Sequence, residues 1–172
     1  MNIRLATPSD AEEILNIYAP YITDTAITFE YTVPSLEDFR QRIVNTLQKY
    51  PYLVALEDDK IVGYAYAGVF KGRAAYDHCV ETSIYVQIDA HGKGIGKALY
   101  SELEERLKEQ GILNVNACIT WSEKENEYVT HQSPDFHEHL GYKRCAHFHQ
   151  CGYKFGQWFD MIWMEKMIGE HN

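Results

Sequence analysis

The sequence predicts an α+β domain in which helices pack on both faces of a mixed β-sheet. Segments with alternating or continuous apolar character are interleaved with segments whose apolar residues recur every three or four positions. The central strands are joined first by a tight turn and then through helices, which is the connectivity of a mixed sheet. The 172 residues contain no repeat, low-complexity tract or linker, so a single domain over residues 1–172 is expected.

The first half of the chain is expected to contain two helices and a hairpin. Thr7 and Pro8 start the first helix, because threonine caps helix starts and proline fits the first turn. Ser35 caps the second helix in the same way. Asp58 and Asp59 form the tight turn of the hairpin. The strands expected in this half are residues 2–6, 52–57 and 61–70.

The second half is expected to alternate strands with two helices. Apolar residues spaced four apart from Ile95 to Leu107 form the buried stripe of a helix that Gly111 ends. The next predicted helix covers residues 125–139, although Pro134 lies inside it and lacks the N–H that a helix interior needs. The strands expected in this half are residues 79–88, 113–120, 142–153 and 157–167.

Composition and charge exclude several classes of protein. The formal net charge of −9 argues against nucleic-acid binding, since a polyanion would be repelled. The N-terminal residues show no basic segment followed by an apolar run, and no stretch approaches the ~20 apolar residues of a membrane span. The four cysteines form no CxxC pair, which predicts reduced thiols in a cytoplasmic protein; they are Cys79, Cys118, Cys145 and Cys151.

Three glycines lie where a predicted strand gives way to a helix. Gly92, Gly94 and Gly96 are costly in a helix, at roughly 1 kcal/mol each relative to alanine. Either the turn requires them, or a ligand approaches the backbone closely. A helix N-terminus with Lys93 and Lys97 beside it would suit a phosphate or pyrophosphate. The spacing fits neither the P-loop nor the dinucleotide-binding fingerprint.

The surrounding sequence, SIYVQIDAHGKGIGKAL, resembles the acetyl-CoA-binding segment of the GNAT superfamily of N-acetyltransferases. In that family an apolar-aromatic-apolar triplet leads into [Q/R]xxGx[G/A] and a helix, and His91 stands where glutamine or arginine is usual. The cofactor-binding residues that the resemblance implies are His91, Gly92, Lys93, Gly94, Ile95, Gly96 and Lys97 for the pyrophosphate, and Ile84, Tyr85 and Val86 for the pantetheine arm.

Other stretches narrow the resemblance. RAAYDHCVETSIYV, HEHLGY and KFGQWFDMIWMEK look like the subgroup that acetylates phosphinothricin, methionine sulfoximine and methionine sulfone. This resemblance implies a mostly antiparallel sheet, acetyl-CoA as co-substrate, direct transfer to the amine of a small amino acid or analogue, and a homodimer. The alternatives are transfer to a peptide N-terminus, a polyamine or an aminoglycoside, or a non-catalytic acyl-CoA-binding sensor.

Three residues are candidates for proton transfer. Glu81 lies in an otherwise apolar strand, where desolvation raises a carboxyl pKa, and the subgroup has a glutamate here; it is the expected base, acting directly or through a water. The alternative for Glu81 is a strand-end acid paired with a lysine or arginine. His137 matches a subgroup histidine and is expected to carry a proton or orient CoA. Tyr142 either packs in the core or protonates the leaving thiolate. The backbone N–H near Val86 is the expected oxyanion donor.

The remaining site residues come from the resemblance. Ser133 keeps the subgroup's spacing to His137, but Asn126, the expected CoA contact, lies too far upstream, and Thr130 occupies its place. An insertion or a reshaped loop is therefore expected. Arg73 either binds the carboxylate of an amino acid or is a solvated cation. The acceptor pocket is expected to include Phe29, Glu30, Arg73, Ala75 and Tyr76.

Cysteines and histidines alternate near the C-terminus, at Cys145, His147, His149 and Cys151. Zinc accepts such ligands, and the alternation puts them on one face of a strand. Ligands in line along one strand rarely converge into a tetrahedron, so no metal site is expected.

Overall fold

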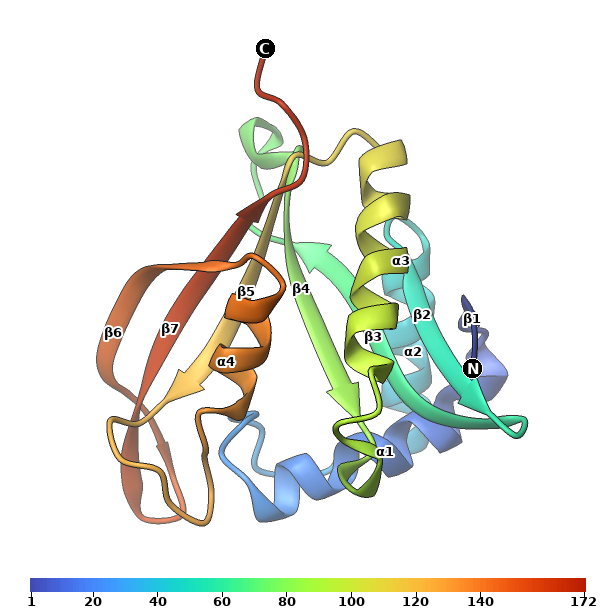
Figure 1. Ribbon diagram of the computed structural model, residues 1–172. Helices are drawn as coiled ribbons and strands as arrows, with labels where there is room; N and C mark the ends of the chain where they lie inside the picture. Colours follow the sequence, from blue (N-terminus) through green and yellow to red (C-terminus); the bar gives the residue numbers. More distant parts are fainter.

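A computed structural model describes residues 1–172 and shows one seven-stranded sheet in the order β1-β2-β3-β4-β5-β7-β6 (Figure 1). All neighbouring strands are antiparallel except β4 and β5, which run parallel. The strands are β1 (Asn2–Leu5), β2 (Tyr52–Glu57), β3 (Lys60–Val69), β4 (Cys79–Val86), β5 (Asn114–Trp121), β6 (Lys143–Lys154) and β7 (Gln157–Met167). The α-helices are α1 (Ala11–Asp24), α2 (Leu36–Leu47), α3 (Ile95–Glu109) and α4 (Gln132–His139).

Each face of the sheet has its own hydrophobic core, which confirms the predicted α+β class. The apolar stripe of α3, from Ile95 to Leu107, packs with Val80 of β4 and Val115 of β5 on one face. Helices α1 and α2 pack on the other face against tyrosines and aliphatic residues of β2 and β3. None of the helices combines the length and the apolar character that crossing a bilayer requires.

The predicted hairpin is confirmed, and its turn residues explain it. Asp58 and Asp59 have φ angles of 48° and 64°, so both lie in the left-handed region. A two-residue turn with both central residues left-handed matches the twist of the flanking strands, and aspartate tolerates this conformation better than most residues. β2 and β3 pair through Glu57 and Lys60, as expected from the sequence.

The helix predicted over residues 125–139 is wrong at its start, because α4 begins only at Gln132. The Asn126 Oδ1 accepts hydrogen bonds from the N–H groups of Tyr128 and Val129, at 2.8 and 3.1 Å. This local bond offers the backbone an alternative to a helix, so residues 125–131 form a loop. Pro134 then falls in the first turn of α4, where a missing N–H costs nothing.

The two parallel strands pair over a short distance only. The pairing of β4 with β5 covers Cys79↔Asn114, Val80↔Val115 and Glu81↔Asn116, and beyond Glu81 the strands separate. Figure 1 shows them diverging toward the end of the sheet where α3 begins and α4 lies. The gap between these strands holds the candidate site.

Candidate active site

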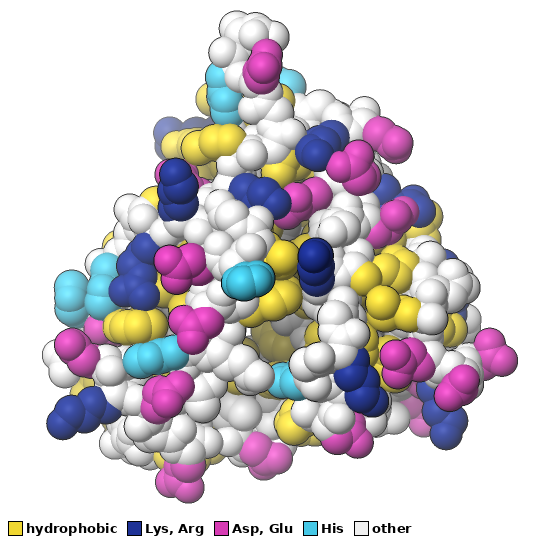
Figure 2. Space-filling model, viewed as in Figure 1, with side chains coloured by type: hydrophobic (Ala, Val, Ile, Leu, Met, Phe, Trp, Pro, Cys, Tyr) yellow, Lys and Arg dark blue, Asp and Glu magenta, His cyan; other side chains and the backbone are white.

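A cavity of about 320 Å³ lies where β4 and β5 separate. Its walls come from the ends of both strands, the start of α3, α4 and the loop before α4. Figure 2 shows it as a hollow in the middle of this face, with hydrophobic side chains in its depth. The lining residues used below are Tyr21, Ile84, Tyr85, Val86, His91, Gly92, Gly94, Ile95, Gly96, Lys97, Thr130, Ser133, Phe136 and His139.

The free edge of β4 faces this gap. The Gln87 N–H donates to the Val62 carbonyl at 2.9 Å, so the odd-numbered residues of β4 direct their backbone groups toward β3. Backbone groups alternate along a strand, and those of Ile84 and Val86 therefore point toward β5, beyond the last paired residue. Of the predicted triplet, Ile84 and Val86 can pair with an extended ligand, whereas the backbone of Tyr85 is already bonded to β3.

The Val86 carbonyl already has partners within the chain. The Tyr21 hydroxyl donates to it, and the His91 Nε2 lies 3.2 Å from it and 2.9 Å from the Tyr21 oxygen. Burial raises the pKa of Tyr21 to about 12, so the hydroxyl keeps its proton. His91 is thus positioned at the cavity wall by α1 and β4. Nothing local in the sequence indicated Tyr21, because its contact with β4 spans 65 residues.

The three glycines serve two different needs. Gly92 and Gly94 have φ angles of 81° and 78°, which L-residues rarely adopt, and an added Cβ at either would meet nothing. Gly96 has an ordinary backbone, but an added Cβ there would lie 2.9 Å from the Cζ of Phe136 in α4. The turn needs the first two glycines for its conformation, and the packing of α3 against α4 needs the third.

The start of α3 presents unpaired donors to the cavity. The first hydrogen bond of the i→i−4 type runs from the Ala98 N–H to the Gly94 carbonyl, at 3.1 Å. The N–H groups of Ile95, Gly96 and Lys97 precede it and have no helical acceptor. Lys93 and Lys97 are exposed and form no ion pair, so their charge is available to an anion here.

Glu81 occupies the point of separation between β4 and β5. It is half-buried, and its carboxylate takes part in no hydrogen bond or ion pair in this structure. Burial raises the pKa of this carboxyl, and the field of Lys71 only partly opposes the shift. Its side chain lies on the α1/α2 face together with Tyr85, since residues two apart share a face. The alternative of a strand-end acid paired with a cation does not fit this geometry.

His137 and Tyr142 lie in the core beneath the cavity and do not line it. The His137 Nδ1 is 2.7 Å from the Ser133 carbonyl, and its Nε2 is 2.9 Å from the Tyr100 hydroxyl. Burial lowers the pKa of His137 to about 4. The Tyr142 ring stacks on Tyr100, and burial raises the pKa of its hydroxyl well above the usual range. Both side chains are therefore buried outside the cavity, and their predicted roles in proton transfer stay predictions.

The loop before α4 brings two of the predicted residues to the cavity and leaves one away from it. Thr130 and Ser133 line the cavity, but Asn126 does not. The Asn126 amide is used within the loop, where its oxygen accepts two backbone N–H groups. Thr130 is therefore available to a ligand in the cavity, whereas Asn126 is not.

The predicted acceptor residues lie outside the cavity, on the α1/α2 side of the sheet. The Glu30 carboxylate is held by Arg42 and the Tyr18 hydroxyl, and these hydrogen bonds lower its pKa although burial opposes the shift. Arg73 is exposed and makes no ion pair. Phe29 lies against Gly152 of β6, where its ring would overlap an added Cβ. None of these side chains lines the cavity, and their place in an acceptor pocket stays a prediction.

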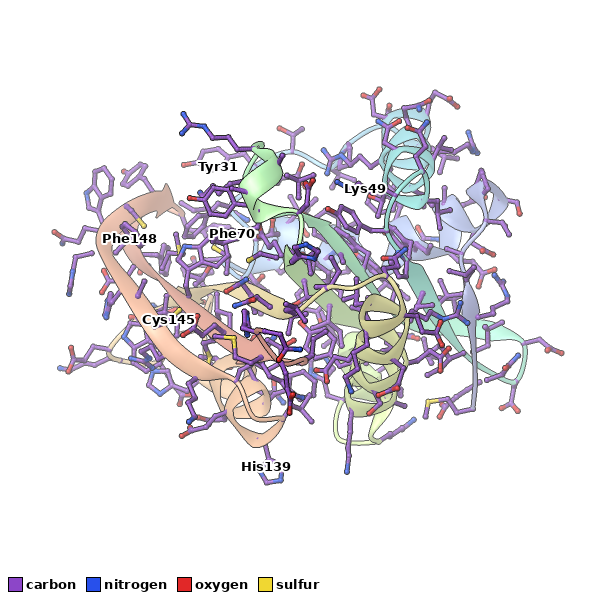
Figure 3. The ribbon with its side chains drawn as sticks, turned by 90° about the horizontal axis from the view of Figure 1, so that it is seen from above. Tyr31, Lys49, Phe70, His139, Cys145 and Phe148 are labelled. Carbon is purple, nitrogen blue, oxygen red and sulfur yellow. The ribbon has the colours of Figure 1, made fainter.

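An aromatic group near the loop of residues 72–78 went unnoticed in the sequence. The Phe70 ring contacts Tyr76 edge-on at 5.9 Å between centroids, and Trp163 at 5.5 Å. Figure 3 shows Phe70 beside the short helical turn of residues 74–76. Ala75 and Tyr76 are exposed on that turn. The aromatic content of residues 157–167 was the one available signal, and it did not specify partners.

A sheet that opens between two parallel strands, beside a helix start with unpaired N–H groups, suits an extended phosphorylated ligand. The fold and the cavity therefore indicate a protein that binds such a ligand. Residues 3–163 match the family described as the acetyltransferase (GNAT) domain. The chain belongs to this family.

Relatives agree along nearly the whole chain. The L-amino acid N-acyltransferase MnaT of Escherichia coli is 32% identical over 99% of this chain and 95% of its own length. The L-methionine sulfoximine/L-methionine sulfone acetyltransferase of Pseudomonas aeruginosa is 33% identical, over 95% of this chain and 92% of its own.

Solved structures agree as well. The phosphinothricin acetyltransferase of Sinorhizobium meliloti, crystallised with acetyl-CoA, is 35% identical. The two structures superpose with a TM-score of 0.89, over 98% of this chain and 88% of that protein. The chain is therefore an N-acetyltransferase, and acetyl-CoA is its co-substrate.

Proposed function

We propose that this chain, as one catalytic domain over residues 1–172, transfers the acetyl group of acetyl-CoA directly to the amine of a small amino acid or analogue of the phosphinothricin or methionine sulfone type. The observation that carries the proposal is the opening between β4 and β5. The cavity beside the start of α3 begins at Ile84, three residues beyond Glu81, which does not line the cavity but is the last paired residue of β4 and has a half-buried carboxylate without a partner. The names of the relatives given above specify amino acids or amino-acid analogues as their substrates.

The co-substrate's polar groups have matching partners in the cavity and beside it. The N–H groups at the start of α3, with Lys93 and Lys97, suit the pyrophosphate. The free edge of β4 at Ile84 and Val86 suits the amide groups of the pantetheine arm. The Val86 N–H is the proposed donor to the thioester oxygen, because a backbone N–H fixed in a strand needs no reorganisation as charge develops there.

Glu81 is the proposed general base, acting directly or through a water. An amine at neutral pH is an ammonium ion and must lose a proton before it can attack a thioester. A carboxylate whose pKa is raised by burial is a stronger base than an exposed one, and no cation within 4 Å competes for it. Its position on the α1/α2 face directs it away from α3, toward the side that holds Arg73 and Tyr76.

The acceptor is proposed to enter from that α1/α2 side. Arg73 is free to bind a carboxylate through its guanidinium, and Phe29, Ala75 and Tyr76 would line the approach. Glu30 would position this wall through Arg42 and Tyr18. This arrangement suits an amino acid better than a polyamine, since the exposed charge near Glu81 is cationic.

A homodimer in the cytoplasm is part of the proposal. Strand β6 is an edge of the sheet, and it and its turn carry exposed aromatic side chains, including Phe148 and Tyr153 at 51% and 50% exposed. Figure 3 shows Phe148 on the outer side of β6. Apolar groups gathered on a sheet edge are typical of an interface. All four cysteines are free thiols, which suits a reducing compartment.

The test is thiol release from acetyl-CoA with a panel of acceptors. The panel contains L-amino acids, methionine sulfone, methionine sulfoximine, phosphinothricin, spermidine, an aminoglycoside and a peptide with a free N-terminus. We expect turnover with the amino-acid group only, and a ~10²–10⁴-fold loss of kcat/KM in Glu81→Gln with unchanged CoA affinity. Glu109→Gln, an exposed glutamate at the far end of α3, is the matched control.

The other outcomes contradict specific parts of the proposal. Turnover confined to the peptide or to spermidine would overturn the amino-acid acceptor while leaving the reaction intact. CoA binding without turnover on any amine would favour an acyl-CoA sensor. Full activity in Glu81→Gln would remove Glu81 from the role of base.

A further inference from the structure

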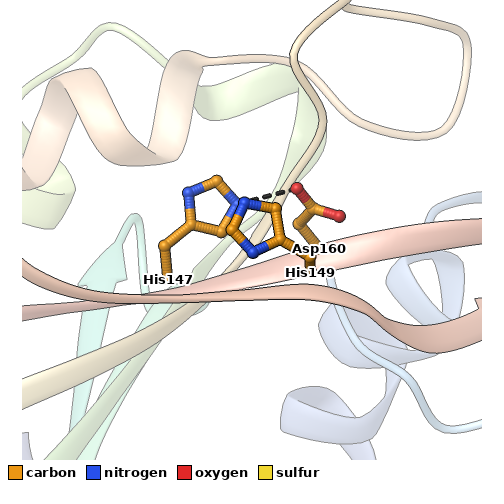
Figure 4. Close-up of side chains that lie close together, drawn as sticks. All are labelled: His147, His149 and Asp160. Carbon is orange, nitrogen blue, oxygen red and sulfur yellow. Dashed lines mark hydrogen bonds and ion pairs between the residues drawn. The ribbon is translucent and has the colours of Figure 1, made fainter.

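Two histidines of the edge strand β6 and an aspartate of β7 lie close together, away from the cavity (Figure 4). His147 and His149 share one face of β6, and their rings stack with centroids 4.1 Å apart and planes within 8° of parallel. The Asp160 Oδ2 lies 2.7 Å from the His147 Nε2. One possible ligand atom from each residue lies within 4.8 Å of the other two.

Tertiary structure supplies what the sequence lacked, a third ligand from a different direction. Regular pairing of β6 with β7 stops at Phe148↔Met161 and resumes at Gly152↔Phe159, so a bulge stands opposite Asp160. Within the bulge Gln150 has a φ of 46°, and its N–H donates to the Asp160 Oδ1 at 2.8 Å. Bulges re-aim side chains, and this hydrogen bond fixes the carboxylate with its other oxygen toward the histidines.

The groups in this cluster match a metal better than an ordinary ion pair. A surface ion pair needs one histidine and the aspartate, but here a second imidazole stacks on the first and adds a third possible ligand atom. Neutral imidazoles and a carboxylate are ligands that zinc prefers.

We propose that His147, His149 and Asp160 form a binding site for a divalent transition metal of the Zn²⁺ type, which joins β6 to β7. Ligand atoms around a tetrahedral zinc lie roughly 3.3 Å apart, given bonds of ~2.05 Å. This spacing falls between the 2.7 Å hydrogen bond and the 4.8 Å limit of the cluster, so side-chain rotations can reach it. The side chains of His147 and Asp160 are 29% and 21% exposed, which leaves the fourth position to water.

The test is calorimetric titration of the purified, tag-free chain with ZnCl₂, and absorption spectroscopy with CoCl₂. A Cys145→Ser/Cys151→Ser background removes the neighbouring thiols. We expect one equivalent of Zn²⁺ to bind, and His147→Ala or Asp160→Asn to weaken it by at least the ~10–100-fold that loss of an outer-shell partner causes. His139→Ala, an exposed histidine on α4, is the control and should bind as the background does.

Two results would overturn the proposal. One is Zn²⁺ binding that survives both His147→Ala and Asp160→Asn unchanged. The other is a sulfur-to-cobalt charge-transfer band in the full chain together with no binding in the background, which would assign the metal to thiolates. His149→Gln, which keeps a polar group on β6, provides a second test if His147→Ala does not fold. Acetyl transfer should be unchanged in the His147, His149 and Asp160 variants, so failure here is distinct from failure of the proposed function.

Discussion

Replacing His137 by glutamine should make the protein less sensitive to acid. Both nitrogens of His137 are hydrogen bonded in the core, and burial lowers its pKa to about 4. The unfolded chain has an ordinary histidine pKa of about 6.5 and binds the proton first as the pH falls. The stability that the neutral ring contributes is therefore present above pH ~6.5 and is lost as the pH falls toward the folded pKa.

The size of the effect follows from these two pKa values. At pH 5 protonation of His137 lowers the free energy of unfolding by RT ln[(1 + 10^1.5)/(1 + 10^−1)], which is about 2 kcal/mol. Below pH 4 the full loss is roughly 3 kcal/mol. Urea unfolding gives the free energy of unfolding at pH 7 and at pH 5. The effect of His137 is the decrease between these pH values in the wild type minus the decrease in His137→Gln. His139→Gln is the matched control, because that histidine is exposed on the same helix. A difference under ~0.5 kcal/mol, or an NMR titration of His137 near pH 6.5, would refute the argument and restore His137 as a proton carrier.

Three further predictions concern the cavity. Gly96→Ala should push the Phe136 ring into the cavity and weaken CoA binding, because overpacking costs ~1–3 kcal/mol and exceeds the ~1 kcal/mol gained in helix propensity. Phe136→Leu in the same chain should restore binding. Unchanged CoA affinity in Gly96→Ala would contradict the contact. Tyr21→Phe should cost ~0.5–1.5 kcal/mol in urea unfolding by releasing the Val86 carbonyl, and an unaltered midpoint would show that this hydrogen bond contributes nothing. The kcat/KM profile should fall toward low pH as Glu81 is protonated, with a midpoint above the ordinary glutamate value; a midpoint at or below that value would refute the raised pKa.

Local chemistry made most of the fold predictable. Asp58 and Asp59 marked a turn that few residues tolerate, and the stripe from Ile95 to Leu107 identified α3 by spacing alone. The exception was the segment before α4, where one side-chain amide, Asn126, competes with a helix that the pattern favoured. Single hydrogen bonds of this kind are invisible to periodicity.

The site residues also differ in how far the sequence could predict them. Residues whose role depends on the backbone of one segment, such as Gly92 and Gly94, could be found from the sequence. Tyr21 could not, because its partner lies 65 residues away. His137 could be recognised by its motif, but its burial against Tyr100 depends on how α4 packs on α3. The approach of Asp160 to His147 likewise depends on a bulge in strand pairing, which no spacing rule indicates.

The short pairing of β4 with β5 divides the sheet into two halves, β1–β4 and β5–β7, which three residue pairs join at one end. The hydrophobic core on the α3 face stabilises this junction, since Val80 and Val115 are both fully buried in it. A ligand lying in the gap therefore acts as an eighth strand that the chain does not encode. Such a ligand should slow amide exchange at Ile84 and Val86 and hold the two halves of the sheet at a fixed angle.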